Sequence, residues 1–341
     1  MRLIRALLRL VLAAFAIGAA ALAILAFLGF ASPELDVLNH LQPFIFTLAV
    51  LGLAITLAAF HGRRWRPAII AFSATGFILS ASVVVPETVS AFLPRDPLPA
   101  DDRPVLKAMT LNLFGLNYQM ERVRDFIAEE QPDIIAFQEY FPEQRGPLHP
   151  MIVGDYPYYA HCVGGKRANI ALYARIPFTF TDSGACSEAA SGVRTARIVA
   201  SFSRDDGTRF SVVTTHLDWP LPAARQREQM HELAEAVENL PGPLIVMADF
   251  NSTPWSYGLR GLVAETGTVR HTRNLVTYPL TFTLPMFTRR RDGLVPLLPF
   301  LPLDHVLTRN GVAVHALWPG SDVNSDHLPV LFTFSVAPTP G

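Results

Sequence analysis

The sequence has little cysteine and little charge, and neither is spread evenly along the chain. Cys162 and Cys186 are the two cysteines among 341 residues, and without a CxxC spacing they do not indicate a zinc or redox motif. Charged residues make up 17% of the chain, whereas the hydrophobic content is 50% and the mean hydropathy is +0.28. Such a composition excludes a disordered polar protein and is too apolar for an ordinary soluble enzyme.

The scarcity of charge is concentrated in residues 1–95, which hold only ten charged side chains. The other 246 residues hold 47, which is a normal density. The first part has a net charge of +4 and the second of −5, so the second part is not a generic polyanion binder, which is usually basic. We therefore expect two regions of different kinds.

Three uncharged apolar runs lie in the first part, at about 10–31, 41–60 and 67–85. The first run would form a helix of roughly 33 Å, enough to cross a hydrocarbon core of about 30 Å. It is also too long for the apolar core of a cleaved signal peptide. We predict a membrane anchor over 1–86 with three transmembrane helices. Buried helices of a soluble domain are the alternative, which three such runs in succession disfavour.

Six arginines lie next to these runs. Arg2, Arg5 and Arg9 precede the first run, and Arg63, Arg64 and Arg66 lie between the second and the third. The loop between the first two runs carries Glu34 and Asp36 instead. The positive-inside rule places the N-terminus and the 61–66 loop in the cytoplasm. If the third run spans, the chain after residue 86 lies on the outer (periplasmic or extracellular) side of the inner or plasma membrane. In that oxidising compartment the two cysteines could form a disulfide, although two unpaired thiols are equally compatible with the sequence.

The remainder of the chain has the pattern of one large α/β domain. Residues 87–104 are rich in proline and acidic residues and are interpreted as a linker, 105–336 as the domain and 337–341 as a tail. Helices are predicted over 120–131 and 223–240. Short β-branched or aromatic runs predict strands at 105–113, 133–139, 169–174, 193–202, 209–217, 243–250, 302–308 and 327–334.

Polar side chains end or follow most of these apolar runs, at Asn112, Glu139, His216, Asp249, Asn251, Asp304, Asp326 and His327. A single polar residue at a strand end is usually a turn former, but eight of carboxylate, amide or imidazole type are difficult to attribute to turns alone. Ligands of open α/β sheets bind at strand ends, where loops converge. We expect these side chains to form one site.

The chemistry of this set favours a hard cation. Carboxylates and amides without cysteine suit Mg²⁺ or Mn²⁺ rather than zinc. Histidines beside such a cation can act as general acid and base near neutral pH. Asp304 could orient His327 so that the imidazole removes a proton from an attacking water. The set fits hydrolysis of a phosphoester.

The residues also carry a family resemblance. In chain order they lie in the motifs MTLNLFGLN, IIAFQEY, TTHLDWP, MADFNSTPWS, LDHVL and SDHLPV. Together, over about 105–336, these motifs resemble the endonuclease/exonuclease/phosphatase superfamily, which includes pancreatic-type deoxyribonuclease, abasic-site endonucleases, sphingomyelinases and inositol-polyphosphate 5-phosphatases. The membrane-anchored layout is similar to that of a bacterial subgroup.

The resemblance implies a two-sheet α/β sandwich flanked by helices, with the site at one edge. It implies that the metal is held by Glu139, Asn112 and Asp326. By the same resemblance Asp249 and Asn251 position the nucleophile and contact phosphate, and His327 is the base or a phosphate ligand, oriented by Asp304. His216 would contact phosphate or help to protonate the leaving group.

The predicted function is that of a membrane-tethered, divalent-metal-dependent phosphoester hydrolase, with no protein partner expected. The alternative is a membrane-tethered binding module for phosphate-containing ligands that has lost turnover, which the presence of all eight site residues disfavours. The substrate stays open among a lipid head group, a nucleic acid and a small phosphoester, as does the choice between diesterase and monoesterase. Residues 284–302, with Arg289, Arg290 and Arg291 among large apolar side chains, form either an interfacial membrane contact or an ordinary cleft loop with a basic tip.

Overall fold

The computed structural model describes residues 2–60, 62, 64–101, 103–180, 186, 195–283 and 294–337. The chain forms two compact units. The first, here called the helical unit, contains Met1–Leu93 together with two later segments, Pro220–Arg227 and Thr253–Arg260. The second, the sandwich unit, contains Pro94–Trp219, Glu228–Ser252 and Gly261–Gly341.

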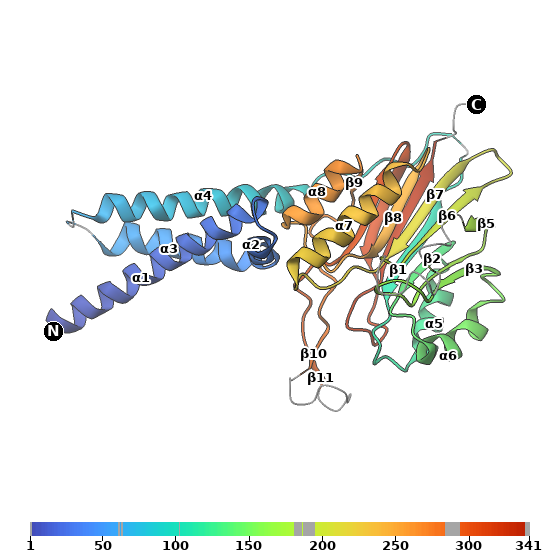
Figure 1. Ribbon diagram of the computed structural model, residues 1–341, viewed down its shortest axis with the longest axis horizontal. Coiled ribbons are helices and arrows are strands. Elements are labelled where there is room, and N and C mark those ends of the chain that lie inside the picture. The colour runs from blue at the N-terminus through green and yellow to red at the C-terminus, as the bar shows by residue number, and fades with distance from the viewer. Residues whose placement is uncertain are drawn as a thin grey trace. The chain divides into compact units, whose positions relative to one another are not determined.

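Three long helices that contact one another make up most of the helical unit (Figure 1): α1 (Arg2–Phe27), α3 (Gln42–Ala59) and α4 (Arg66–Ser90). Short helical turns connect α1 to α3: η1 (Leu28–Phe30), α2 (Pro33–Asp36) and η2 (Val37–Leu41). Small residues permit close packing, since a Cβ on Gly76 would lie 2.7 Å from the Cα of Ala20. By length and composition, Leu3–Phe30, Pro33–Ala59 and Arg66–Ser90 could each cross a membrane, with hydropathies of 2.7, 2.0 and 2.2.

The sandwich unit contains two mixed six-stranded sheets, in agreement with the predicted two-sheet α/β sandwich. The strand order of the first sheet is β13 (Val312–Pro319), β14 (Val330–Val336), β1 (Leu106–Asn112), β2 (Ile134–Gln138), β4 (Ile170–Ala174) and β3 (Tyr158–Cys162). That of the second is β5 (Phe178–Phe180), β6 (Arg197–Ser203), β7 (Arg209–Thr215), β8 (Leu244–Asp249), β12 (Asp304–Arg309) and β9 (Val269–Arg270).

The core lies on the facing sides of the two sheets. Ala108 and Ile134 of the first sheet join the same buried cluster as Val212, Met247 and Val306 of the second. The alternation of inward and outward side chains along each strand produces this arrangement. The cluster fixes both sheets as one scaffold, so side chains at the strand ends are held in place.

Helices complete the sandwich unit. On the outer face of the first sheet, α5 (Met120–Glu130) and α6 (Pro142–Ile152) bury residues such as Val123 and Leu148 in a second cluster. The remaining helices, α7 (Ala223–Glu238) and α8 (Tyr257–Glu265), each begin in the helical unit and end in the sandwich unit.

The strand β10 (Thr281–Thr283) directly precedes the 284–302 segment, for which the sequence allows a membrane contact, and its antiparallel partner β11 (Leu294–Pro296) lies within that segment. Residues 284–293 of that segment, with its three arginines, lie outside the described residues. In the described part, Leu298 is 88% exposed. Elsewhere, Cys162 and Cys186 are joined by a disulfide, so one of the two possibilities left open by the sequence is realised.

Strand directions bring the polar strand ends to one edge of the sandwich. The parallel pair β1–β2 sets Asn112 opposite Gln138, and β7 runs parallel to β8 with a bridge between His216 and Asp249. Since β12 runs antiparallel to β8, its first residue, Asp304, lies opposite the last residue of β8, Asp249. The two sheets therefore contribute to a single edge.

Candidate active site

Asp249, the last residue of β8, lies at the centre of the site and is completely buried. Its Oδ2 accepts a hydrogen bond from Nδ2 of Asn112 at 3.0 Å, a contact that joins the ends of β1 and β8. Its Oδ1 accepts from the backbone N–H of Asn251 at 2.8 Å. This carboxylate therefore connects the two sheets through hydrogen bonds to both.

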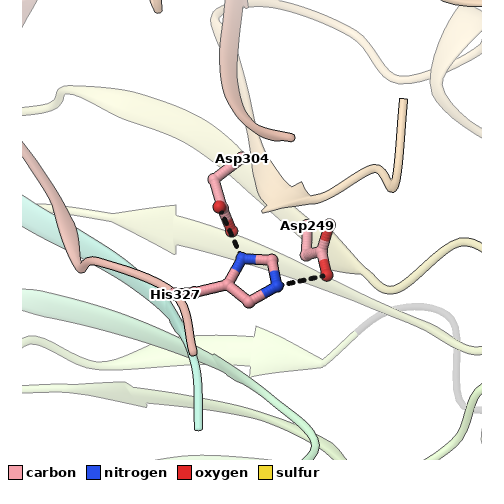
Figure 2. A group of neighbouring side chains, drawn as sticks. All are labelled: Asp249, Asp304 and His327. Carbon is pink, nitrogen blue, oxygen red and sulfur yellow. Dashed lines mark hydrogen bonds and ion pairs between the residues drawn. The ribbon is translucent and has the colours of Figure 1, made fainter. Parts of the chain in front are cut away.

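His327 lies between two carboxylates (Figure 2). Its Nδ1 is 2.8 Å from Oδ2 of Asp304, and its Nε2 is 3.7 Å from Oδ2 of Asp249. The Asp304 oxygen also accepts from the hydroxyl of Thr277 at 2.6 Å. Because Nδ1 is directed at Asp304, the other ring nitrogen is the one left to exchange a proton with a reactant.

His216 and Asn251 also contact Asp249. Nε2 of His216 is 3.3 Å from Oδ2 of Asp249 and 3.1 Å from Nδ2 of Asn251. The Asn251 amide also donates to the carbonyl of Leu217 at 2.9 Å. Its backbone φ of 47° lies in the left-handed region, which asparagine tolerates better than most residues. The structure thus brings His216 and Asn251 into the same cluster as Asp249.

Glu139 directly follows β2 and has a left-handed φ of 53°, a strained conformation for a glutamate that is often found at functional sites. Its Oε2 accepts from the backbone N–H of Gly115 at 2.7 Å. A side chain on Gly115 would be crowded, since its Cβ would lie 3.0 Å from the ring of Phe141. Glu139 is therefore fixed at the sheet edge by the backbone of the loop that follows β1.

Concentrated negative charge perturbs the ionisation of the site. Burial opposes protonation of His327, but the carboxylates of Asp304, Asp249 and Asp326 outweigh it and raise the pKa of the imidazole to about 10. Burial raises the pKa of Asp326 to about 7, and the nearby Glu139 and Asp249 contribute in the same direction. For Asp249 the effect of burial is overcome by His327 and His216, which hold its pKa below the usual range.

Two groups of side chains could hold a divalent cation. Asp249, Asp304 and His327 offer ligand atoms within 4.8 Å of one another. However, the imidazole and Asp304 already satisfy each other at 2.8 Å, the arrangement of an orienting pair. The charge of Glu139 instead raises the pKa of Asp326, and a cation held beside these carboxylates would relieve the repulsion. Glu139 and Asp326, with the amide of Asn112, also offer the oxygen ligands that a hard cation prefers.

Two neighbouring residues of the site were not found from the sequence. Thr277 donates to Asp304, and the ring of Tyr278 lies 4.7 Å from that of His327. They belong to an irregular segment without periodicity, so no pattern marked them. Trp219 is 43% exposed, and its ring centroid lies 5.5 Å from that of Tyr278. Tyr278 thus packs against the His327 ring, and Trp219 packs against Tyr278.

Comparison with known proteins agrees with the fold. Residues 109–327 match the sequence model of the Endonuclease/Exonuclease/phosphatase family. A 140-residue stretch, 41% of this chain, is 29% identical to the UPF0294 protein VV2535 of Vibrio vulnificus. The matched stretch is 44% of that relative's length.

Solved structures show the same architecture at low sequence identity. D. rerio TDP2 complexed with single strand DNA product is 15% identical, with a TM-score of 0.51, and the alignment covers 69% of this chain and 100% of that one. The endonuclease/exonuclease/phosphatase from Beutenbergia cavernae is 18% identical, with a TM-score of 0.50 and coverage of 69% and 72%. The human Nocturnin catalytic domain is also 18% identical, with a TM-score of 0.50 and coverage of 70% and 97%. At these identities the likeness establishes the fold alone.

Proposed function

Because the chain belongs to the endonuclease/exonuclease/phosphatase family, whose members hydrolyse phosphoesters, we propose that it is a divalent-metal-dependent phosphoester hydrolase tethered to a membrane. The observation that carries the proposal is the position of His327, whose imidazole lies between the carboxylates of Asp304 and Asp249. This arrangement presents one ring nitrogen to a reactant at the edge where the family motifs converge.

In the proposed reaction, Asp304 orients His327 through Nδ1. Without a bound cation the surrounding carboxylates keep the imidazole protonated, with a pKa of about 10. A cation held at Asp326 would offset that negative charge and lower the pKa, so that Nε2 can take a proton from the attacking water. Asp249 Oδ2 accepts hydrogen bonds from the side-chain amides of Asn112 and Asn251, which holds both amides beside the site where they can contact phosphate oxygens. These fixed dipoles stabilise charge that develops on the phosphoryl group.

Mg²⁺ or Mn²⁺, held by Glu139 and Asp326 beside Asn112, would supply Lewis-acid stabilisation of the phosphoryl oxygens when bound. The raised pKa of Asp326, to about 7, supports this placement because burial and the neighbouring Glu139 and Asp249 leave negative charge uncompensated. His216, whose Nε2 is 3.3 Å from Oδ2 of Asp249, is proposed to contact the phosphate or to protonate the leaving group.

The membrane part of the proposal rests on the three apolar helices and on the arginine pattern, which favours the outer side for the sandwich unit. The Cys162–Cys186 disulfide supports the same side, since such bonds persist in oxidising compartments. Substrates at that face would include lipid head groups, nucleic acids and small phosphoesters.

The first prediction concerns Glu139. In the full-length protein in detergent micelles with Mg²⁺, we expect E139Q to lower kcat for bis(p-nitrophenyl) phosphate by about 100-fold or more, because it removes a metal-binding charge. E143Q is the matched control, since Glu143 is exposed and lies four positions later, in the first turn of α6. Its activity should equal that of the native protein.

A substrate panel of a sphingomyelin-like lipid, DNA and an inositol phosphate then identifies the natural class. If the native protein shows no metal-dependent turnover on any of these substrates but binds one of them, the non-catalytic binding module replaces the proposed function. Equal activity of E139Q and E143Q would overturn the assignment of Glu139.

A further inference from the structure

Asp36 lies in the short connection between α1 and α3, yet its carboxylate is buried in the helical unit, with 5% of the residue exposed. Five hydrogen-bond donors from three parts of this unit surround it: Asn39, Arg227, Ser256, Tyr257 and Gly258. Only a carboxylate can accept from all of them with both oxygens. An asparagine here would direct its amide N–H₂ group at other donors.

Most of these donors belong to the start of α8. Asp36 accepts from the backbone N–H of Tyr257 at 2.8 Å and of Gly258 at 2.9 Å, two groups that a helix N-terminus leaves without an intrahelical partner. Ser256 donates its hydroxyl to Asp36 at 3.1 Å and accepts from the N–H of Leu259 at 3.3 Å. The negative charge also suits the helix dipole. A residue from the first connection therefore caps a helix more than 200 positions later.

A chain of buried hydrogen bonds extends from Asp36 into the three-helix bundle. Nδ2 of Asn39 donates to Asp36 at 2.9 Å, and Oδ1 of Asn39 accepts from Gln42 at 2.7 Å. Gln42 in turn accepts from the hydroxyl of Ser80 on α4 at 2.8 Å. A polar group buried in this way is costly unless it is paired, so each link holds the next in one geometry.

The segment that leads to α8 starts at the site itself. Its first residues after Asn251 are Ser252 and Thr253, and both are held by imidazoles. The carbonyl of Ser252 is 2.8 Å from Nε2 of His305, the residue after Asp304. The backbone N–H of Thr253 donates to Nδ1 of His40 at 3.2 Å. The backbone is thus fixed immediately after the Asp249–Asn251 turn.

We propose that Asp36 is a positioning residue for the phosphoesterase site, acting through the N-terminus of α8 and residues 252–256 on the turn that carries Asp249 and Asn251. The inference rests on the proposed function. On this inference the connection between α1 and α3 supports the geometry of the active site as well as joining two helices.

The test compares D36N with E34Q in the full-length protein in detergent micelles. Glu34 is an exposed carboxylate of the same connection, so E34Q is a matched control. The first readout is hydrogen–deuterium exchange over residues 249–258, which requires no turnover. We expect D36N to exchange about tenfold faster at Phe250 and Asn251, while residues 312–319 of β13 stay unchanged.

The second readout is the steady-state kinetics per folded molecule with bis(p-nitrophenyl) phosphate and Mg²⁺. We expect kcat of D36N to fall by about 10- to 100-fold, with KM within about threefold, because small displacements of aligned groups cost rate more than binding. A purely structural role would lower the folded fraction and leave kcat per folded molecule intact. S256A removes one donor to Asp36 and leaves no unpaired charge. We expect it to show the faster exchange and the lower kcat more weakly, and it replaces D36N in the test if D36N does not fold.

Two results would overturn the inference: exchange at 250–251 in D36N equal to that in E34Q, or unchanged kcat per folded molecule in both D36N and S256A. The native protein is assayed in parallel. If it shows no turnover, the proposed function fails, and the exchange measurement still decides whether Asp36 holds the turn.

Discussion

The imidazole of His327 has contacts on both ring nitrogens and on one face. Asp304 and Asp249 lie at the nitrogens, and Tyr278 packs at a ring-centroid distance of 4.7 Å. The carboxylates and the imidazole were anticipated from the sequence because each ends or begins an apolar run whose period marks a strand. Thr277 and Tyr278 were not, because their role depends on where an irregular segment passes in space.

Substitution of Tyr278 separates the roles of its ring and its hydroxyl. We expect Y278F to keep kcat within about threefold of native, because the ring contact with His327 persists, and Y278A to lose about tenfold, since an aromatic pair contributes roughly 0.5–1.5 kcal/mol. Steady-state kinetics of the two variants measure this. Equal losses in Y278F and Y278A would assign the effect to the hydroxyl instead.

Among the elements, those with a clear period were predicted well and those without it were missed. The predicted helix over 120–131 corresponds to α5 (Met120–Glu130), and the predicted strand over 243–250 to β8 (Leu244–Asp249). In contrast, α6 (Pro142–Ile152) contains Pro147 and Pro150, which argue against a helix by propensity. The short α8 begins with glycines at 258 and 261, and its N-terminus is stabilised by a residue far away in sequence. Tertiary contacts overrode local preference at both helices.

A pH dependence of stability is expected from the contact between the segment after β9 and β12. His271 is buried, and its Nε2 is 2.8 Å from the hydroxyl of Thr308. Burial, with a smaller contribution from nearby arginines, lowers the pKa of His271 to about 4. Below pH 6.5 the unfolded chain takes up a proton at His271 that the folded protein does not. The contribution of the neutral, buried His271 to the free energy of unfolding is therefore fully present above pH 6.5 and falls as the pH drops toward 4.

The expected loss of unfolding free energy from this residue is about 3 kcal/mol by pH 4. Urea unfolding of the full-length protein between pH 7 and pH 4.5, compared with that of H271Q, measures it. H271Q should be less stable at pH 7 but should show a shallower decline. Parallel declines in the two proteins would exclude His271 as the cause.

At the scale of the whole molecule, two features were not visible in the sequence. Segments 220–227 and 253–260 belong to the helical unit although they are distant from it along the chain. The ion pair between Arg227 and Asp36 spans 191 positions, and no local pattern encodes such a pair. The three apolar runs, by contrast, were evident because membrane-length helices require uninterrupted apolar sequence.

The orientation of the chain in the membrane can be tested with two single substitutions at exposed positions. Glu238 lies at the end of α7, and Arg64 lies in the loop before α4. With the sandwich unit on the outer side, we expect a membrane-impermeant maleimide to label E238C in spheroplasts and R64C only after lysis. The native protein, whose two cysteines are joined in a disulfide, is the unlabelled control. Labelling of R64C but not E238C in spheroplasts would reverse the orientation.

The position of His327 just before the last strand, β14, has a consequence for biosynthesis. Asn112 and Glu139 are translated first, and the imidazole of His327 follows Glu139 by 188 positions. β14 must then insert between β13 and β1 before that imidazole reaches Asp304. The site therefore assembles in chain order: Asn112 and Glu139 are present first, and the His327–Asp304 pair forms only after β14 has joined the sheet.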